Sequence, residues 1–163
     1  MLRPSLALSD LKKAGRIWPA FLICVLIRHA GRNVVLKSVH IAIEAAEKIL
    51  PGEVAPEGEE DPRWQAIMLI EDFVETEPEA ILPFVLRWGR HEQEDLRTAI
   101  AVLLVEHLLE FHFQSLFHHI EKASLEDALF GDMFLRAWKL GQAKEPENSA
   151  RFEALRSRIK LRK

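Results

Sequence analysis

Apolar residues recur along most of the chain at intervals of three and four positions, and runs of alternating β-branched residues are few. This spacing places apolar side chains on one face of a helix, so the pattern predicts an all-α fold. Prolines, glycines and short polar stretches divide the pattern into segments. The helices that we expect cover residues 17–30, 33–50, 62–76, 78–89, 95–109, 114–124 and 125–141, with a short basic helix near the C-terminus.

Residues 51–61 are the clearest predicted loop, because two prolines, two glycines and five acidic residues make them too polar and irregular to pack. A second break is expected near Phe111 and His112, where the preceding helical pattern ends. Helices joined by short connections pack as antiparallel neighbours, so the pattern favours a series of helical hairpins.

Two segments of the chain match each other at a spacing of 34 residues. "PRWQAIMLIEDFV" and "LRTAIAVLLVEHL" place Arg63 and Arg97 at equivalent positions, and in both segments apolar residues follow six and seven positions after the arginine. A fixed period of this length is typical of helical repeat proteins.

The stretch "ILPFVLRWGRHEQEDLRTAIAVLL", residues 81–104, resembles one complete HEAT repeat, and the resemblance is best over residues 78–109. The matching residues are Leu82 and Pro83 in the first helix, and Leu96, Arg97, Ala99, Ala101 and Leu104 in the second. Small residues let the paired helices approach, and the arginine is placed to cap a helix or to pair with neighbouring acids.

The resemblance implies a fold of antiparallel helical hairpins stacked as a short HEAT-like α-solenoid of about three units, over residues 1–141. Residues 142–163 are then a polar connector and a short basic C-terminal helix. The last unit, residues 113–139, departs from the family pattern, because Phe117 replaces the proline and Gly131 replaces the arginine. The core that we expect is Ile67, Ile70, Val74, Leu82, Val85, Leu86, Ile100, Leu103, Leu104, Leu116 and Leu135.

Charge is unevenly distributed along the chain. The net charge is −3, but residues 1–40 carry +6, residues 41–150 carry −14 and residues 151–163 carry +5. Binding to a phosphate backbone requires a broad basic face, which an acidic body disfavours. We therefore expect a protein partner with a basic surface rather than a nucleic acid.

The compartment that we expect is the cytoplasm. The single cysteine, Cys24, fits a reducing environment and lies in an apolar run, so it is interpreted as a buried hydrophobe. That run, residues 17–27, has eleven residues, well short of the ~20 needed to span a bilayer. Charged residues follow it where a signal peptide would need a cleavage site, so neither a membrane span nor secretion is expected.

Residues 106–122 hold four of the seven histidines together with three glutamates, which raises the possibility of a metal site. His107 and His112 are separated by about 140° on a helix at ~100° per residue, so they do not face one ion. No zinc signature and no second cysteine are present, so we expect neither a metal nor a cofactor. His112, His118 and His119 are instead expected near one repeat edge, where protonation would make partner binding sensitive to pH.

The tryptophans suggest one enzymatic alternative. They are Trp18, Trp64, Trp88 and Trp138, and their expected place is the core or the packing between repeats. DNA glycosylases built from HEAT-like repeats grip damaged duplex with Trp and Asp on a concave basic surface. Trp64 and Trp88, with Asp72 or Asp95, would take these roles, but the acidic body disfavours them.

The sequence carries no catalytic signature or phosphate-binding loop, so the leading hypothesis is a non-enzymatic helical repeat protein that mediates protein–protein interaction. The candidate partner-binding residues are Trp64, Trp88, His112, His118 and His119. The alternatives are a nucleic-acid-binding or glycosylase-like HEAT-repeat protein, and a small regulatory or immunity-type protein whose acidic body neutralises a basic partner.

Overall fold

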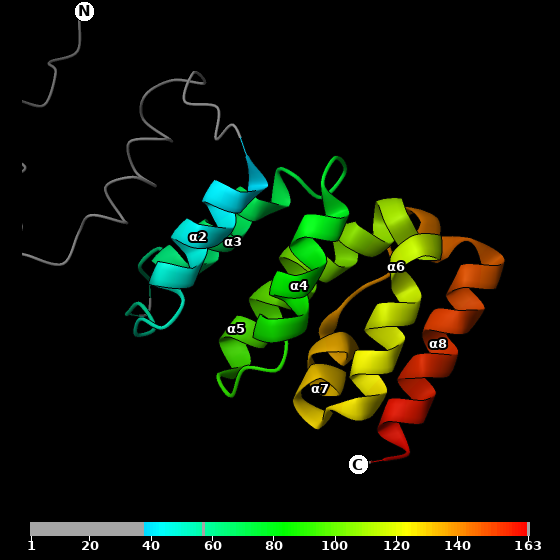
Figure 1. The fold of residues 1–163 in the computed structure, drawn as a ribbon. Coiled ribbons are helices and arrows are strands. Elements are labelled where there is room, and N and C mark those ends of the chain that lie inside the picture. The colour runs from blue at the N-terminus through cyan, green and yellow to red at the C-terminus, as the bar shows by residue number, and fades with distance from the viewer. Residues whose placement is uncertain (1–37, 57, 163) are drawn as a thin grey trace, which may run out of the picture. The chain divides into compact units, whose positions relative to one another are not determined.

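The computed structural model describes residues 38–56 and 58–162, and every regular element in these ranges is a helix (Figure 1). The elements are α2 (Val39–Ile49), α3 (Pro62–Glu71), α4 (Pro78–Trp88), α5 (Glu94–Ala99), the π-helical segment η2 (Ile100–Val105), α6 (Glu106–Glu126), α7 (Ala128–Arg136), the 3-10 helix η3 (Gly141–Lys144) and α8 (Pro146–Lys160). The all-α prediction is confirmed for these residues. The helix predicted over residues 17–30, with Trp18 and Cys24, lies outside them.

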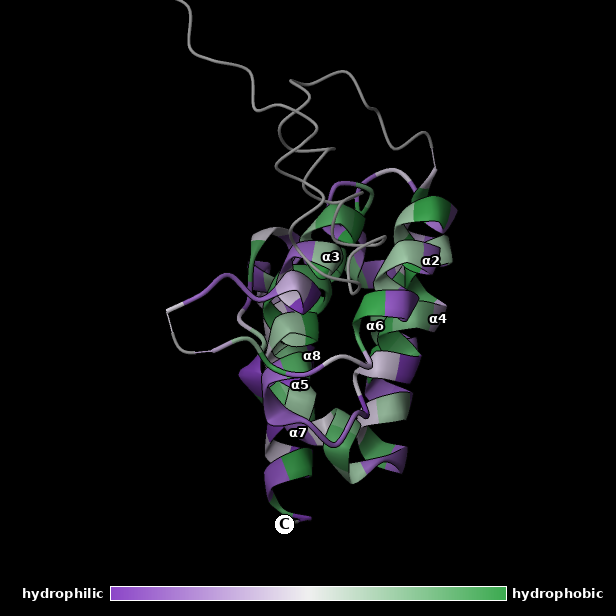
Figure 2. Cartoon of the chain, turned by 90° about the vertical axis from the view of Figure 1, so that its left-hand side faces the viewer, coloured by the Kyte–Doolittle hydropathy of each residue, from purple (hydrophilic) through white to green (hydrophobic). Residues whose placement is uncertain are grey.

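The helices form two layers that the chain visits alternately. The front layer contains α2, α4 and the later part of α6, and the back layer contains α3, α5 with η2, and α7 (Figures 1 and 2). Across the layers α2 packs against α3, α4 against η2 and α6 against α7, while α8 packs against α6 and α7. The predicted loop at residues 51–61 joins α2 to α3 and is mostly hydrophilic in Figure 2.

The helix ends follow from residues that stop or start a helix. Asp61 caps α3 by accepting a hydrogen bond from the backbone N–H of Arg63 at 2.8 Å, and Pro62 occupies the first helical position. Gly89 ends α4, as predicted. A Cβ at Gly89 would lie 2.7 Å from the ring of Phe130 and 2.8 Å from the carbonyl oxygen of Val85, so only glycine lets α4 end this close to α7.

Two predicted helices have different boundaries in the structure. The helix expected over residues 62–76 ends at Glu71, and turns occupy the remaining positions. The single helix expected over residues 125–141 is wrong. Asp127 has an extended backbone and its carboxylate accepts from the N–H of Phe130 at 2.9 Å, so it starts a new helix, and residues 137–140 are not helical.

The predicted break near His112 is confirmed, although it takes the form of a kink. Helical structure runs without a loop from Glu94 to Glu126, and His112 inside it has non-helical angles, φ −132° and ψ 35°. The chain passes from the back layer to the front layer at this kink (Figure 1).

The run from Glu94 to Glu126 is, among the described residues, the one helix long and apolar enough to cross a membrane by length and composition. Its mean hydropathy reaches 1.4, and 56% of the window concerned is buried inside the protein. The run packs against α3, α4, α7 and α8, so burial in the core accounts for its apolar composition.

Most of the predicted core residues are buried, whereas Leu86, Leu103 and Leu135 are only partly buried. The sequence interpretation missed a group of buried phenylalanines between α6, α7 and α8, which are Phe113, Phe117, Phe130, Phe134 and Phe152. Phe113 and Phe117 stack with ring centroids 4.4 Å apart, and those of Phe134 and Phe152 are 4.6 Å apart. These contacts give the C-terminal part of the fold an aromatic core.

The connection from α7 to α8, residues 137–145, crosses the kink in α6. The side-chain amide of Gln142 accepts from the N–H of Phe113 at 3.0 Å and donates to the carbonyl oxygen of Phe111 at 2.6 Å. The kink at His112 lies between these two residues, so Gln142 binds the backbone on both sides of it. Asn148 donates to the carbonyl oxygen of Gln142 at 2.9 Å, so α8 is tied to the same point. With Phe152, Leu155 and Ile159 buried, the C-terminal helix is part of the folded unit.

Candidate protein-binding surface

Arg63 connects α3 to the start of α5. Its side chain is completely buried, and its guanidinium donates to Asp61 at 2.6 Å, to the amide oxygen of Gln93 at 2.8 Å, and to Asp95. Burial alone would raise the pKa of Asp61, but hydrogen bonds from Arg63 outweigh it and hold that pKa below its ordinary value. The network therefore fixes the side chains of Gln93 and Asp95 at the start of α5.

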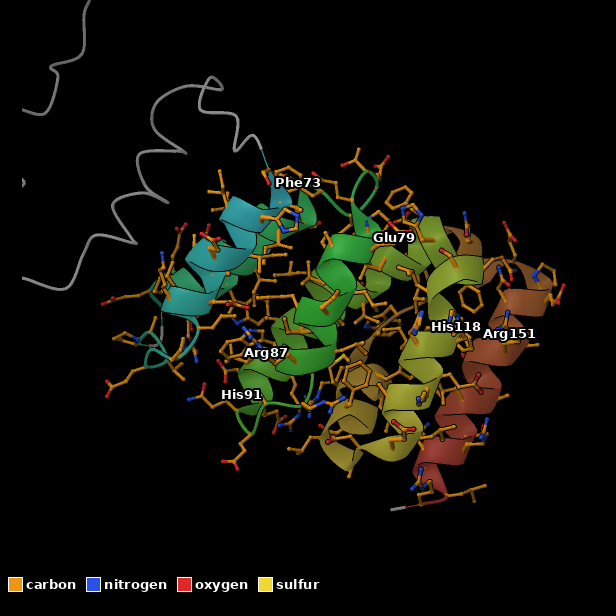
Figure 3. All side chains as sticks on the ribbon, viewed as in Figure 1. Phe73, Glu79, Arg87, His91, His118 and Arg151 are labelled. Atoms are coloured by element: carbon orange, nitrogen blue, oxygen red, sulfur yellow. The ribbon has the colours of Figure 1, made fainter. Side chains whose placement is uncertain are left out.

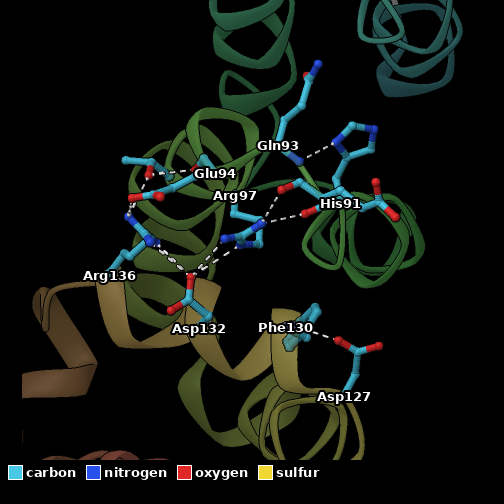
Figure 4. Close-up of polar contacts among 10 residues, drawn as sticks. His91, Gln93, Glu94, Arg97, Asp127, Phe130, Asp132 and Arg136 are labelled. Carbon is cyan, nitrogen blue, oxygen red and sulfur yellow. Dashed lines mark hydrogen bonds and ion pairs between the residues drawn. The ribbon is translucent and has the colours of Figure 1, made fainter.

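Arg97 connects α5 to α7 in a similar way. Its guanidinium donates to Asp132 at 3.1 Å and to the carbonyl oxygens of His91 and Glu92, both at 2.8 Å. Arg136 also contacts Asp132, at 3.0 Å, so two cations share one carboxylate (Figure 4). Arg136 reaches back to Glu94 on α5 at 2.9 Å.

A shallow depression, here called the α3–α5 groove, lies between α3 and the start of α5. Its lining residues are Val54, Trp64, Gln93, Glu94, Asp95 and Thr98. The indole of Trp64 and the exposed side chain of Val54 supply apolar surface, and the carboxylates of Glu94 and Asp95 supply negative charge. Figure 4 shows Gln93 directed away from the Arg97 network, which agrees with its hydrogen bond to Arg63. The groove thus combines an aromatic wall with two carboxylates.

Trp138 is the second feature of the back layer. Its side chain is 71% exposed, more than that of any other aromatic residue in the described part of the chain. The backbone N–H of Trp138 donates to the carboxylate of Glu106 at 2.9 Å, and this hydrogen bond holds it beside the first turn of α6. The expectation that Trp138 packs in the core or between repeats is wrong, because α7 ends at Arg136 and the chain leaves the helix before Trp138.

Glu106 is a buried carboxylate, only 8% exposed, directly after the π-helical segment. Burial raises its pKa, and the hydrogen bond from Trp138 offsets part of that effect. π-Helical turns are frequent at functional sites. Here the turn brings Glu106 to the position from which it holds the exposed tryptophan.

The structure does not bring the five predicted partner-binding residues together. Trp64 lies in the α3–α5 groove, whereas Trp88 lies at the end of α4, partly buried and stacked on His91 with ring centroids 5.4 Å apart. Its indole N–H is buried and has no hydrogen-bond partner among the described residues. Trp64 is therefore the one tryptophan of this predicted pair that belongs to the back-layer surface.

The predicted histidines lie elsewhere. His112 occupies the kink, where its Nε2 lies 3.2 Å from the carbonyl oxygen of Glu75. His118 and His119 are exposed on α6 in the front layer, with ring centroids 3.7 Å apart, and Figure 3 shows His118 on the same face as Arg151 of α8. The histidines and the α3–α5 groove are thus on different layers.

The remaining histidine of this stretch contacts two carboxylates. The two ring nitrogens of His107 lie 2.9 Å from Glu110 and 3.3 Å from Glu71, so His107 links α6 to the end of α3. Within residues 38–56 and 58–162, no group of three or more His, Cys, Asp or Glu side chains is arranged to hold a metal ion.

Comparisons of the chain with protein-family models, with curated proteins and with solved structures give no match. The surface therefore has to be interpreted from its own residues. Sequence interpretation found Trp64 but missed Trp138, Val54 and Glu106. No local pattern singles out these three, because their exposure and contacts depend on where helices distant in sequence end.

Proposed function

We propose that this chain is a non-enzymatic, HEAT-like helical repeat protein that binds another protein through the back layer of its helices. One observation carries the proposal, namely the exposed indole of Trp138. Tryptophan is strongly enriched among the residues that dominate binding energy at protein interfaces, and an exposed one gives the isolated chain no stability by burial. The backbone N–H of Trp138 also donates a hydrogen bond to Glu106, which fixes the point of the backbone from which the indole projects.

The two arginine networks support the solenoid architecture. Arg63 reaches from α3 to Asp95 on α5, and Arg97 reaches from α5 to Asp132 on α7. Similar ion pairs thus join successive helices of one layer. In a repeat protein each unit contacts only its neighbours, so contacts of this kind are expected between stacked units. The 34-residue spacing of the two arginines corresponds to one step along this layer.

Charge favours a protein over a nucleic acid as the partner. Glu94 and Asp95 line the groove of the back layer, and the two arginines that link the helices of this layer, Arg63 and Arg97, are buried and paired with carboxylates. Phosphate groups need unpaired cations, whereas a protein partner with a basic surface fits these carboxylates.

The proposal is tested by affinity capture with the purified chain as bait. The wild type and a Lys122→Ala control, altered at an exposed residue of the front layer, are expected to capture the same partner, and Trp138→Ala is expected to lose most of it. Equal capture by Trp138→Ala and the wild type would contradict the assigned surface. Turnover of a substrate by the purified chain would contradict the non-enzymatic assignment.

A further inference from the structure

We propose that the α3–α5 groove is the subsite that takes a basic side chain, arginine or lysine, from an extended segment of the partner protein. This inference rests on the proposed function and adds the chemistry of the ligand. It is carried by the composition of the groove, in which one aromatic wall and two carboxylates face the same depression.

The aromatic wall suits the long side chain of a basic residue. Trp64 is partly buried and lines the groove, and Val54, at 56% exposed, forms the rim on the side of the loop. A guanidinium or ammonium group placed over an indole is attracted by the ring, and the methylene groups of the same side chain cover apolar surface. An acidic or purely apolar side chain would use only part of these contacts.

The carboxylates supply the charge that selects a cation. The side chain of Glu94 is 70% exposed, and that of Asp95 is 34% exposed although it also binds Arg63. Arg63 is completely buried and holds Asp95 in place. It presents no exposed guanidinium to repel an incoming cation.

The surroundings of the groove are also acidic. Glu53, Glu59 and Glu60 are exposed in the loop that carries Val54, and residues 41–150 together carry −14. This charge attracts a basic segment from a distance, while Trp64 provides the short-range contact. One cation, Arg136 on α7, also pairs with Glu94. Its guanidinium contacts Asp132 as well, so its positive charge is shared between two carboxylates.

The occupant that fits is an extended peptide with several basic residues. The groove is shallow and open along the surface of the back layer, so it accommodates a chain that passes across it. Trp138 lies further along the same layer, beside Glu106, where it offers an apolar contact to another part of the partner. The partner would then contact the chain at two separate places, with an apolar contact at Trp138 and a cationic one in the groove.

The test uses the full chain and a fluorescein-labelled octa-arginine peptide, titrated by fluorescence anisotropy at fixed ionic strength. We expect binding by the wild type, and a rise in Kd of about threefold or more for both Trp64→Ala and Glu94→Gln. The charge-matched control is Glu126→Gln, which removes an exposed carboxylate at the end of α6 and is expected to leave Kd unchanged. Because the side chain of Glu94 is exposed, Glu94→Gln is expected to fold normally. It therefore still tests the groove if Trp64→Ala fails to fold.

The outcomes separate this inference from the proposed function. If Glu126→Gln weakens binding as much as Glu94→Gln, the peptide responds only to overall charge and the groove is not its site. If an octa-glutamate peptide or a short DNA duplex binds in place of octa-arginine, the cationic assignment is wrong. In each of these cases a loss of partner capture by Trp138→Ala would leave the protein-binding function in place. Retained capture by Trp138→Ala would overturn that function, even if the groove binds the peptide.

Discussion

Arg63 and Arg97 occupy equivalent places in the sequence, 34 residues apart, but their surroundings in the structure differ. Within residues 38–56 and 58–162, the guanidinium of Arg63 binds only side chains, from Asp61, Gln93 and Asp95, and no second arginine shares these partners. Arg97 binds two backbone carbonyl oxygens as well as Asp132, and Arg136 shares that carboxylate.

The same repeated arginine thus joins two pairs of helices, but the second pair is held by more contacts than the first. Between α3 and α5, a single buried cation neutralises two carboxylates. Between α5 and α7, a second arginine contacts the same carboxylate, and the connection after α7 is itself bound to α6 by Gln142. We therefore expect the first junction to be more sensitive to loss of its arginine than the second.

The largest effect is expected for Arg63→Ala. Loss of a buried cation leaves Asp61, Asp95 and Gln93 without their main partner, so the free energy of unfolding should fall by about 3–5 kcal/mol. Chemical denaturation followed by far-UV circular dichroism measures it. The control is Arg87→Ala, because the side chain of Arg87 is 57% exposed and its pair with Glu47 should contribute ~1 kcal/mol or less. A loss for Arg63→Ala no greater than that of the control would refute the assigned role.

The same variant should change the response to acid. The pKa of Asp61 in the folded protein is below its ordinary value of 3.8, so the carboxylate stabilises the fold above that pH. This contribution is lost as the pH falls through the lowered pKa. Stability measured between neutral pH and pH ~3 should therefore fall less steeply in Arg63→Ala than in the wild type, since the variant lacks the partner that lowers the pKa.

Arg97→Ala is expected to have a smaller effect, about 2–3 kcal/mol, because Arg136 still contacts Asp132. The double variant Arg97→Ala/Arg136→Ala sharpens the comparison. It should lose more stability than the two single variants added together, since only the double variant removes both Arg97 and Arg136 from Asp132. Additive losses would show that the second junction has no redundancy and that the contrast with Arg63 is incorrect.

Gln142→Ala tests the hydrogen bonds that accompany the kink. The N–H of Phe113 and the carbonyl oxygen of Phe111 would lose their partner, at a cost of about 1–3 kcal/mol in unfolding free energy. Gln142→Glu keeps an acceptor for Phe113 but loses the donor to Phe111, so an intermediate loss is expected. Hydrogen exchange of the Phe113 amide should increase in the alanine variant and remain slower in the glutamate variant.

The smallest effect, and a gain, is expected for Glu106→Gln. Burial raises the pKa of Glu106 above its ordinary 4.5, so its contribution to stability is present at low pH and is lost as the pH rises through the folded-state pKa. The amide keeps an acceptor for the N–H of Trp138 without the buried charge. Unfolding at neutral pH should therefore require more free energy than in the wild type, and the difference should shrink as the pH falls below the ordinary value of 4.5. A loss of stability at neutral pH would show that the charge itself is needed.

The helical character of the described residues followed from the apolar spacing, because burial of one helix face dominates the choice of secondary structure. The breaks at residues 51–61, Gly89 and His112 also followed from local signals. The break at Asp127 did not, because the apolar pattern continues across it and only the capping hydrogen bond to Phe130 shows where the new helix begins. Leu86, Leu103 and Leu135 were assigned to the core by spacing, but neighbouring helices cover them only in part.

The candidate surface was less predictable than the fold. Trp64 and Asp95 were singled out as sequence candidates for one shared role, and the structure places both in the α3–α5 groove. Trp138 was assigned to packing because it lies inside the helix predicted over residues 125–141 and tryptophan rings are usually buried by packing. Its exposure depends on the end of α7 at Arg136 and on the distant Glu106, which no local pattern relates to it.

By itself the sequence determined the helical segments, their main breaks and the equivalence of Arg63 and Arg97, because these depend on side-chain spacing within one helix or one turn. Only the tertiary structure decided that these arginines join successive helices of one layer, that Gln142 satisfies the kink at His112, and that Trp64 and Trp138 both belong to the back layer. Such contacts join residues about 30 or more positions apart. Their geometry is set by the packing of the whole unit and not by the composition of any one segment.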